Sequence, residues 1–346
     1  MVQRSRGIDP QEAKQDRDRK AIDLAFKPYS ERFVEDCLKV KWKSWHGEAD
    51  SLLRLYAVPV LGNKPLPDIT RTDIRAVLSK PKGKTATKRN LFTVLRRLFK
   101  WAVSEGDLVE SPISGMEPPP APPSRDRVLS DIELRLVWLG TEKMEYPFGP
   151  LIRLLMITGQ RLEEVAGLEW SELSQDKSRW SIPASRAKNN EAAELPLSSL
   201  AVAEIAGLAK RRTKGKTDKW PRTGLVFTTT GKTSVSGYSR AKRRVDRETA
   251  ALAKKEKPVM TIDPWRFHDL RRTLATGLQR LGVRFEVTEA VLNHVGSSRS
   301  GIAGVYQRHD WADEKRAALD AWAGHIERCL KPSDETNVVP LATARA

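Results

Sequence analysis

Cysteine is scarce in this sequence: Cys37 and Cys329 are the only two among 346 residues. Two such distant cysteines argue against a disulfide framework and a cysteine-based metal site, and they suit a reducing compartment. Long apolar runs are also missing, since no stretch approaches the roughly 20 residues that a membrane-spanning helix needs. The polar, charged N-terminus argues against a secretory signal peptide. We therefore expect a cytoplasmic protein with no membrane association.

Acidic side chains are few relative to basic ones. The chain has 61 Lys and Arg residues against 44 Asp and Glu residues, a formal net charge of +17 and an isoelectric point near 9.9. A strong positive charge on a soluble protein points first to a polyanionic partner, most often nucleic acid. The hydrophobic content of 39% is sufficient for packed cores, and this length predicts about two domains.

The positive charge is concentrated in two blocks. Residues 71–100 contain ten basic side chains and one acidic one, and residues 210–257 contain sixteen basic and four acidic ones. The net charges of these blocks are +9 and +12, so the rest of the chain is slightly acidic. One run of Lys and Arg is often only a solvated helix face. Two separate blocks favour two surfaces that bind one polyanion through its phosphates.

A proline-rich segment divides the chain. Six prolines lie between Pro112 and Pro123. Because proline fixes φ and removes amide donors, we expect an extended, semi-rigid linker there. The predicted domains and termini are a mobile N-terminal segment 1–27, a helical domain 28–110, the linker 111–124, a second domain 125–330 and a disordered tail 331–346.

The first domain shows helical periodicity, which predicts four helices. The clearest is 85–104, where apolar residues form one stripe and basic residues flank it. The sequence of 69–73 predicts an N-cap at the start of another helix. The basic residues of helix 85–104 that we expect to contact nucleic acid are Lys88, Arg89, Arg96, Arg97 and Lys100.

The second domain has a mixed pattern. Helices are predicted from about 130 and over 151–157, 198–211, 236–255, 268–281, 286–294 and 312–328. Two strand-like segments, 180–183 and 194–197, flank a polar hairpin tip that includes Lys188. The predicted fold class is therefore mainly α with a small β-sheet (α+β), in two domains. The basic residues of helix 236–255 that we expect to contact nucleic acid are Arg240, Arg243 and Arg244.

Four local patterns contain residues that suit a phosphate. Gly159 ends one helix and Arg161 opens the next, where a guanidinium and free backbone amides favour an anion. His268 and Arg271 have the i, i+3 spacing of one helix face. His294 and Tyr306 follow. Taken singly, each has a commoner explanation: a surface Arg–Glu pair, a capping histidine or a core tyrosine.

Metal binding competes for any set of histidines. No His-x-x-x-His pair falls on a predicted helix, and no cysteine lies near the histidine cluster, so we expect no metal and no cofactor. The five histidines of the chain are His46, His268, His294, His309 and His325.

The joint order of these patterns resembles the tyrosine recombinase (phage integrase) family. The matching stretches are TGQRLEEVAGLEW, the hairpin around AKNNEAAELPLS, HDLRRTLATGL and VLNHVGSSRSGIAGVYQRHDWADEKRAALDAW. The last is especially close to integrases of prophages and genomic islands. Residues 28–110 resemble the core-binding domain of that family, so the resemblance covers about 28–330.

The resemblance implies a role for each matching residue. Tyr306 would be the nucleophile, in a reaction that forms a covalent 3′-phosphotyrosine without metal or ATP. Arg161 and Arg271 would clamp the scissile phosphate. Lys188 would protonate the leaving 5′ oxygen.

Other matching residues would support this chemistry. His268 would act in proton transfer, His294 would hydrogen-bond the phosphate, and Glu164 would brace the site. Lys177 and Arg186 lie near Lys188 in the sequence and remain alternatives for its role.

The chain departs from the family pattern in two places. Asn293 stands where the family often has glycine, a change that we expect to be tolerated. Residues 5–10 resemble only the end of the family's arm-binding domain. A misassigned start, a truncation and a true lack of arm-site binding all remain open.

The resemblance also implies partners. They are double-stranded DNA at attachment sites and other copies of the chain in a tetramer on DNA, with a monomer in free solution. An excisionase or a DNA-bending host protein would be accessory, and the location would be the bacterial nucleoid. We expect helix 312–328 to pack onto a neighbouring protomer, the alternative being its own domain.

Two other functions compete with recombination. A type IB topoisomerase-like relaxase shares this chemistry without needing partner subunits. A non-catalytic DNA-binding regulator is the other, and the full set of matching residues argues against it.

Overall fold

The structure is a computed structural model that describes residues 24–42, 45–294 and 309–331. The chain divides into two compact units, Met1–Ser124 (unit 1) and Arg125–Ala346 (unit 2). The described residues are mainly helical, with a single two-stranded antiparallel sheet in unit 2. This confirms the predicted fold class. None of the helices in the described ranges is long and apolar enough to cross a membrane.

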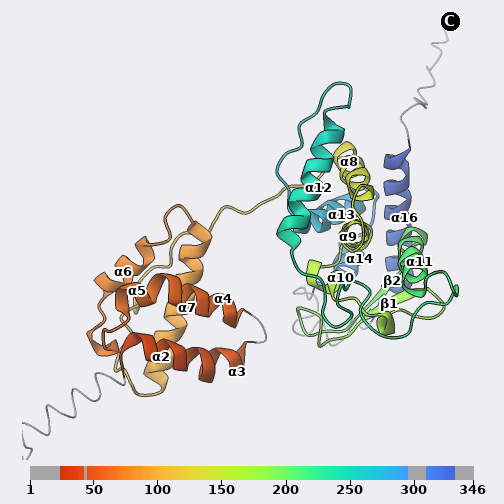
Figure 1. Ribbon diagram of the computed structural model, residues 1–346. Helices are drawn as coiled ribbons and strands as arrows, with labels where there is room; N and C mark the ends of the chain where they lie inside the picture. The colour runs from red at the N-terminus through yellow and green to blue at the C-terminus, as the bar shows by residue number, and fades with distance from the viewer. Residues whose placement is uncertain (1–23, 43–44, 295–308, 332–346) are drawn as a thin grey trace, which may run out of the picture. The chain divides into compact units, whose positions relative to one another are not determined.

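In the described residues of unit 1, the helical segments join into four rods, which Figure 1 displays. Two of them include π-helical turns, and a short 3-10 turn, η4 (Leu66–Asp68), precedes the third. In chain order the rods are α2–η2–α3 (Phe26–Phe33, Val34–Leu38, Lys39–Lys41), α4–η3–α5 (His46–Leu52, Leu53–Ala57, Val58–Leu61), α6 (Arg71–Ser79) and α7 (Thr85–Ser104).

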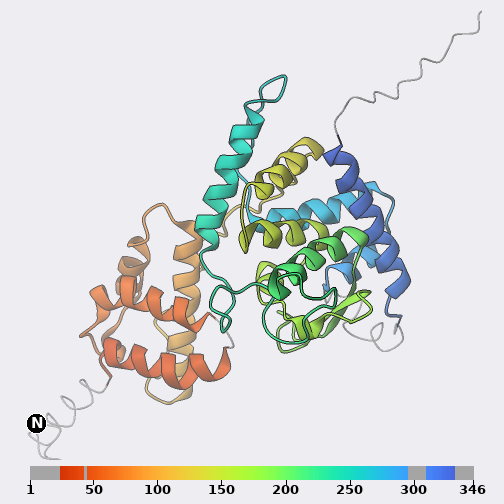
Figure 2. The same cartoon turned by 45° about the vertical axis from the view of Figure 1, so that its right-hand side comes forward.

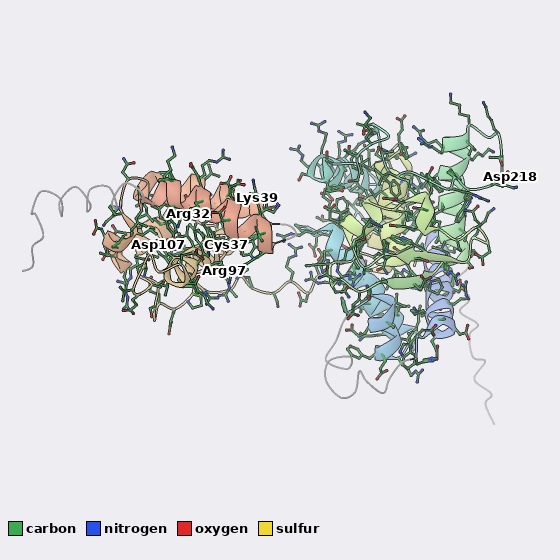
Figure 3. All side chains as sticks on the ribbon, turned by 90° about the horizontal axis from the view of Figure 1, so that it is seen from below. Arg32, Cys37, Lys39, Arg97, Asp107 and Asp218 are labelled. Carbon is green, nitrogen blue, oxygen red and sulfur yellow. The ribbon has the colours of Figure 1, made fainter. Side chains whose placement is uncertain are left out.

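Helix α7 provides much of the core of unit 1. Its predicted apolar stripe is completely buried: Leu91, Val94, Leu95, Leu98, Phe99 and Ala102. The predicted N-cap of α6 is confirmed, because Thr70 and Asp73 form a reciprocal capping box. At the edge of the core, Tyr29 and Arg32 both donate to the Asp107 carboxylate at 2.7 Å. Figure 3 labels Arg32 and Asp107 on this unit.

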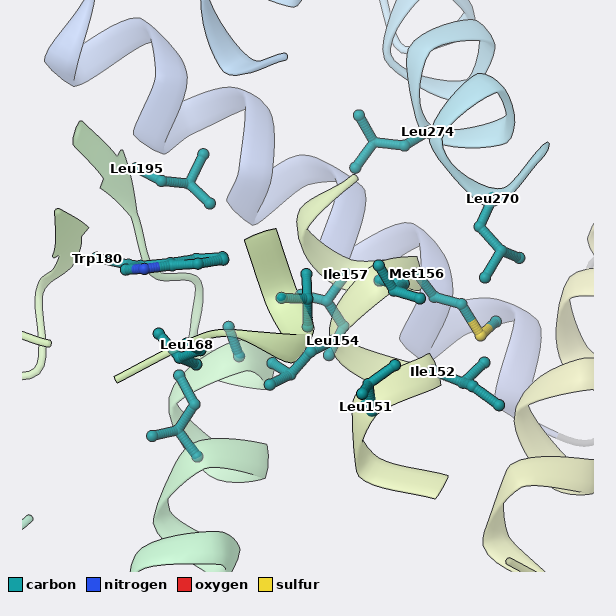
Figure 4. Close-up of a cluster of buried hydrophobic side chains, with 14 of the residues drawn as sticks. Leu151, Ile152, Leu154, Met156, Ile157, Leu168, Trp180, Leu195, Leu270 and Leu274 are labelled. Carbon is teal, nitrogen blue, oxygen red and sulfur yellow. The ribbon is translucent and has the colours of Figure 1, made fainter. Parts of the chain in front are cut away.

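Unit 2 is built around helix α9, which is almost entirely buried. Figure 4 shows the α9 side chains between Leu270 and Leu274 of α13 on one side and Trp180 and Leu195 of the two strands on the other. The elements of this unit are α8 (Asp131–Glu142), α9 (Phe148–Thr158), α10 (Leu162–Ala166), η5 (Trp170–Glu172), β1 (Arg179–Ile182), β2 (Ala193–Pro196), α11 (Ser199–Thr213), α12 (Tyr238–Ala253), α13 (Phe267–Arg280), α14 (Phe285–Val291) and α16 (Ala312–Leu330).

The two strands form the predicted hairpin, one residue earlier than expected at each end. Arg179 pairs with Pro196 and Ile182 with Ala193. Pro183 has no amide hydrogen to contribute to the ladder, which explains why β1 ends before it. The connection between the strands holds Lys188.

Helix α16 packs on its own unit, so the expectation that it packs onto a neighbouring protomer is wrong. Its apolar face is buried among the other helices: Ala318, Leu319, Trp322, Ala323 and Ile326. The Trp322 indole donates to the Met156 carbonyl of α9 at 2.9 Å. A β-carbon at Gly277 of α13 would lie 2.2 Å from the Trp322 ring, so the close contact requires glycine.

We expect Trp322→Ala to lower the free energy of unfolding of the chain by about 3–5 kcal/mol, because it leaves a cavity beneath α16. Urea unfolding measures this change. Glu327→Ala, on the exposed side of the same helix, is the control and should change stability by less than about 0.5 kcal/mol. Equal stability of the two variants would contradict the docking of α16 on unit 2.

Candidate active site

Arg161 begins α10 at a sharp turn after α9. Gly159 ends α9 with φ of +63°, a left-handed conformation that favours glycine. Glu164, 3% exposed, accepts the Arg161 backbone amide at 3.0 Å and its guanidinium at 2.9 Å. Glu164 therefore braces the Arg161 side chain from its own helix.

Arg271 is buried next to this turn. It is 4% exposed and donates to the Gly159 carbonyl at 2.8 Å and to the Leu292 carbonyl. Burial and then the positive charge of Arg161 lower the pKa of Arg271 to about 10. Two guanidinium groups close enough to repel each other favour an anion between or beside them, because an anion relieves both the repulsion and the desolvation.

His268 is on the first turn of α13, close to both arginines. Its surface is exposed, yet neighbouring protein atoms partly desolvate the imidazole. This desolvation, followed by the charges of Arg272 and Arg271, lowers the pKa of His268 below its usual 6.5. The imidazole is therefore neutral near pH 7 and able to accept a proton.

The C-terminal end of α14 is hydrogen-bonded to the side chains of Gln160 and Arg271. The buried Gln160 side chain donates to the Val291 carbonyl at 2.8 Å, and Arg271 donates to the carbonyl of the next residue. These bonds satisfy carbonyls that the helix end leaves free. His294 follows at once, exposed, with its Nδ1 at 2.9 Å from the Glu289 carboxylate.

Lys188 lies in the β1–β2 connection and is exposed. Within the described part of the chain it has no hydrogen-bond or ion-pair partner. The two alternatives are already engaged: Arg186 forms two 2.6 Å bonds to the Glu172 carboxylate, and the Lys177 ammonium lies 5.6 Å from the centre of the Trp220 ring. The geometry therefore favours Lys188 over both as the free ammonium group.

Unit 2 thus brings Arg161, Glu164, His268 and Arg271 together, with His294 and Lys188 on segments attached to them. Tyr306 lies outside the described residues. Sequence reasoning missed Gln160, Glu172 and Asn189 as supporting residues. Gln160 adjoins Arg161 in the first motif, but its partner is 131 positions away, and no local pattern indicates such a contact.

One set of side chains in unit 2 has the composition of a metal site. Asp131 of α8 lies beside His325 and Cys329 of α16, with all three ligand atoms within 4.8 Å of one another. The His325 Nε2 is 3.1 Å from Asp131 and 3.6 Å from the Cys329 sulfur. This pairing of a cysteine with a histidine was not anticipated from the sequence. It includes none of the candidate active-site residues.

Unit 1 carries a basic hollow on α7 and the end of the first rod. Its lining residues are Lys41, Trp42, Thr93, Arg96, Arg97 and Lys100. The Arg97 Nε is buried and has no hydrogen-bond partner within the described ranges; Figure 3 labels this residue. Lys88 and Arg89 are half-buried nearer the start of α7, and Arg89 donates to the Pro119 carbonyl at 2.6 Å.

Unit 2 carries its basic residues on α12, which lies along α8 and projects at the edge of the unit (Figure 2). Arg240, Arg243 and Arg244 are all exposed. Arg244 donates to the Lys143 carbonyl at 3.3 Å. The opposite side of α12 is packed, with Ala241 and Val245 buried, so the three arginines lie on its exposed side.

Profiles of two phage integrase domains match this chain. The phage integrase family profile matches residues 141–310, and that of the phage integrase central domain matches residues 26–117. The chain belongs to the phage integrase family of tyrosine recombinases. Its function is site-specific DNA recombination, and the relaxase and regulator alternatives are not favoured.

Known integrases are similar to this chain over nearly all of its length or over a part of it. Prophage integrase IntZ of Escherichia coli (strain K12) is 25% identical over 342 residues, which cover 94% of this chain and 77% of IntZ. The integrase of Enterobacteria phage 434 is 27% identical over 115 residues, 33% of this chain and 32% of its own length. Among solved structures, a lambda integrase tetramer bound to a Holliday junction has a TM-score of 0.64 at 18% identity. That match covers 86% of this chain and 84% of the lambda protein.

The electrostatics of the site make a testable prediction about His268. We expect its pKa to be below 6.5 and to rise in Arg272→Gln, since that guanidinium opposes protonation of the ring. Because the unfolded chain binds this proton more tightly, the folded state loses stability as the pH falls below about 6.5. A pH titration of ring nitrogen shifts by NMR measures the pKa.

Arg280→Gln, at the far end of α13, is the control and should leave the His268 titration unchanged. Asp269 keeps its bonds to the Arg266 amide and to Arg125 in Arg272→Gln, so the start of α13 should be preserved. An unaltered pKa in Arg272→Gln would show that the neighbouring charge does not act on the ring.

Proposed function

We propose that this integrase cuts and rejoins duplex DNA with Tyr306 as the nucleophile and Arg161, His268 and Arg271 as the centre of the phosphate site. The observation that carries the proposal is the pair of guanidinium groups, one braced by Glu164 and the other buried, so close that the charge of Arg161 lowers the pKa of Arg271. A scissile phosphate is the anion that this arrangement fits.

The proposed step is a transesterification. The phenolic oxygen of Tyr306 forms a bond to phosphorus, the bond from phosphorus to the 5′ oxygen breaks, and a covalent 3′-phosphotyrosine results. Fixed guanidinium donors stabilise the additional negative charge of the transition state. His268, neutral at pH 7, accepts the phenol proton, and His294 hydrogen-bonds the phosphate.

Lys188 completes the proton balance by protonating the leaving 5′ oxygen. The reverse step uses the 5′ hydroxyl of another strand and regenerates the phenol. Because the phosphodiester energy is kept in the covalent intermediate, rejoining requires no ATP. Glu164 takes no part in the bonds that change and holds Arg161 in place.

A suicide substrate tests the nucleophile. The substrate is a nicked duplex of the attachment site, taken from the junctions between the element and its host chromosome. We expect a covalent protein–DNA adduct that forms in the presence of a metal chelator and disappears in Tyr306→Phe. Denaturing gels detect the adduct. Persistence of the adduct in Tyr306→Phe would refute the assignment of Tyr306.

We place the DNA backbone on both basic surfaces. In unit 1 the hollow combines the cations of Arg96 and Lys100 with the Trp42 side chain and the unpaired Arg97 Nε. In unit 2 the three exposed arginines of α12 are the corresponding surface. Both surfaces would add to the affinity for DNA by binding its phosphates, but they would contribute little to recognition of a particular DNA sequence.

Salt dependence tests the surface of unit 1. Each phosphate contact steepens the slope of log binding constant against log salt by about 0.9. The double variant Arg96→Gln, Lys100→Gln should therefore reduce the slope by about 1.8, as measured by fluorescence anisotropy. Lys39→Gln is the control, because the Lys39 ammonium is paired with Glu35 at 2.6 Å. An unchanged slope in the double variant would remove this surface from the proposal.

The assembly on DNA is a further part of the proposal. A lambda integrase of similar fold forms a tetramer on a Holliday junction, which supports a homo-tetramer of this chain on DNA and a monomer in free solution. An excisionase or a DNA-bending host protein would then set the direction of recombination, in the nucleoid. Subunit contacts must come from surfaces other than the buried face of α16.

A further inference from the structure

Two asparagines join the β1–β2 connection to the end of α14. The Asn189 side-chain amide donates to the Asn293 carbonyl at 3.0 Å. In return, the Asn293 side-chain amide donates to the Glu191 carbonyl at 3.3 Å and approaches the Asn189 side-chain oxygen at 3.5 Å. These bonds connect segments about 104 positions apart in the sequence.

The backbone at Asn293 makes these contacts possible. Its φ is +46°, in the left-handed region that asparagine tolerates better than other residues except glycine. Asn293 is 9% exposed, so its amide needs partners within the protein. Asparagine therefore keeps the turn that a glycine would allow here and adds a side chain that fastens the connection.

The same connection has a second anchor two residues before Lys188. Arg186 binds the Glu172 carboxylate twice and donates to the Glu164 carbonyl at 3.3 Å. Ala187 between them is buried. Lys188 is thus the exposed residue of a short stretch whose two neighbours in the polypeptide chain are fixed, one by burial and the other by the bond from Asn189.

We infer that Asn189 and Asn293 form a latch that positions Lys188 for protonation of the leaving 5′ oxygen. The inference rests on the role proposed for Lys188. Without the latch the ten-residue connection between Ile182 and Ala193 keeps only the Arg186 anchor. The Lys188 ammonium then samples a larger volume, which lowers the fraction of time it spends near the reacting group.

The latch also couples Lys188 to the phosphate site. Asn293 directly follows Leu292, whose carbonyl accepts from Arg271, and directly precedes His294. A displacement of this helix end would therefore move the histidine, the latch and the lysine together. Asn189 and Asn293 are positioning residues in this scheme, since neither contacts the reacting atoms.

A substrate with sulfur in place of the bridging 5′ oxygen tests the latch. A thiolate leaves without protonation, because a thiol is far more acidic than an alcohol. Single-turnover cleavage is measured on the oxygen and sulfur substrates. We expect Lys188→Ala to slow cleavage of the oxygen substrate by about 10²–10⁴-fold. Asn189→Ala should slow cleavage of the same substrate by at least about tenfold, but by less than Lys188→Ala does. Both variants should cleave the sulfur substrate at nearly the rate of the unaltered protein.

Matched variants separate positioning from folding. Asn293→Gly keeps the left-handed backbone but loses the hydrogen bonds of the Asn293 side chain. We expect it to slow cleavage of the oxygen substrate less than Asn189→Ala does, and to cleave the sulfur substrate at nearly the normal rate. Ser185→Ala, an exposed position of the same connection, is the control and should cleave both substrates normally. Arg271→Lys should cleave both the oxygen and the sulfur substrate slowly, because Arg271 is proposed to bind the phosphate in each. DNA affinity and thermal unfolding of Asn189→Ala should match those of the unaltered protein.

The outcomes distinguish the latch from the proposed function. If Lys188→Ala is slow on both substrates, the proton-donor role of Lys188 fails and the latch loses its purpose. If sulfur restores Lys188→Ala while Asn189→Ala cleaves the oxygen substrate at full rate, Lys188 acts as proposed and the latch is wrong. Equal slowing of Asn189→Ala on both substrates would assign it to the fold or to phosphate binding, which also overturns the latch.

Discussion

The buried guanidinium of Arg271 holds the candidate active site of this integrase together. It donates to the carbonyl that ends α9 and to a carbonyl that ends α14, and so joins two chain turns that the sequence separates widely. A buried charge is costly unless it is hydrogen-bonded, and here its bonds go to main-chain oxygens, not to a carboxylate. Among the described residues no carboxylate forms an ion pair with Arg271, so its positive charge is available to an anion. The nearby Glu164 carboxylate forms its ion pair with Arg161 and not with Arg271.

Other contacts extend this arrangement outward. Gln160 reinforces the same helix end, Glu164 fixes Arg161 and also provides a carbonyl for Arg186, and Arg186 anchors the connection that holds Lys188. Asn189 and Asn293 form the last of these contacts, which join the β1–β2 connection to the end of α14. Each of these bonds is modest, near 1 kcal/mol for a neutral pair, but together they set the positions of groups that must meet one phosphate. The supporting side chains of Gln160 and Glu164 are buried, whereas Lys188, at the end of this chain of contacts, is exposed.

In the proposed function, DNA affinity and chemistry reside in different parts of the protein. Basic side chains are numerous on α7 and α12, and those of Arg96, Lys100, Arg240, Arg243 and Arg244 are exposed. The candidate catalytic groups, by contrast, add little to the net charge of +17. This separation has a physical reason. Phosphate contacts along a duplex need many mobile cations at a surface, but stabilisation of a transition state needs a few donors that are fixed before the reaction begins.

The sequence by itself determined the elements and the chemistry. Helix α7, the cap at Thr70, the hairpin and the fold class follow from local periodicity and capping, because these depend on residues close in the chain. The order of motifs indicated the candidate residues and the family. Only the tertiary structure decided that α16 packs on its own unit and that Asn189 meets Asn293. It also decided that Arg186 is bound to Glu172, whereas Lys188 has no partner among the described residues. An amphipathic helix shows that it has an apolar face but not which surface covers it, and hydrogen bonds across a hundred positions leave no local pattern.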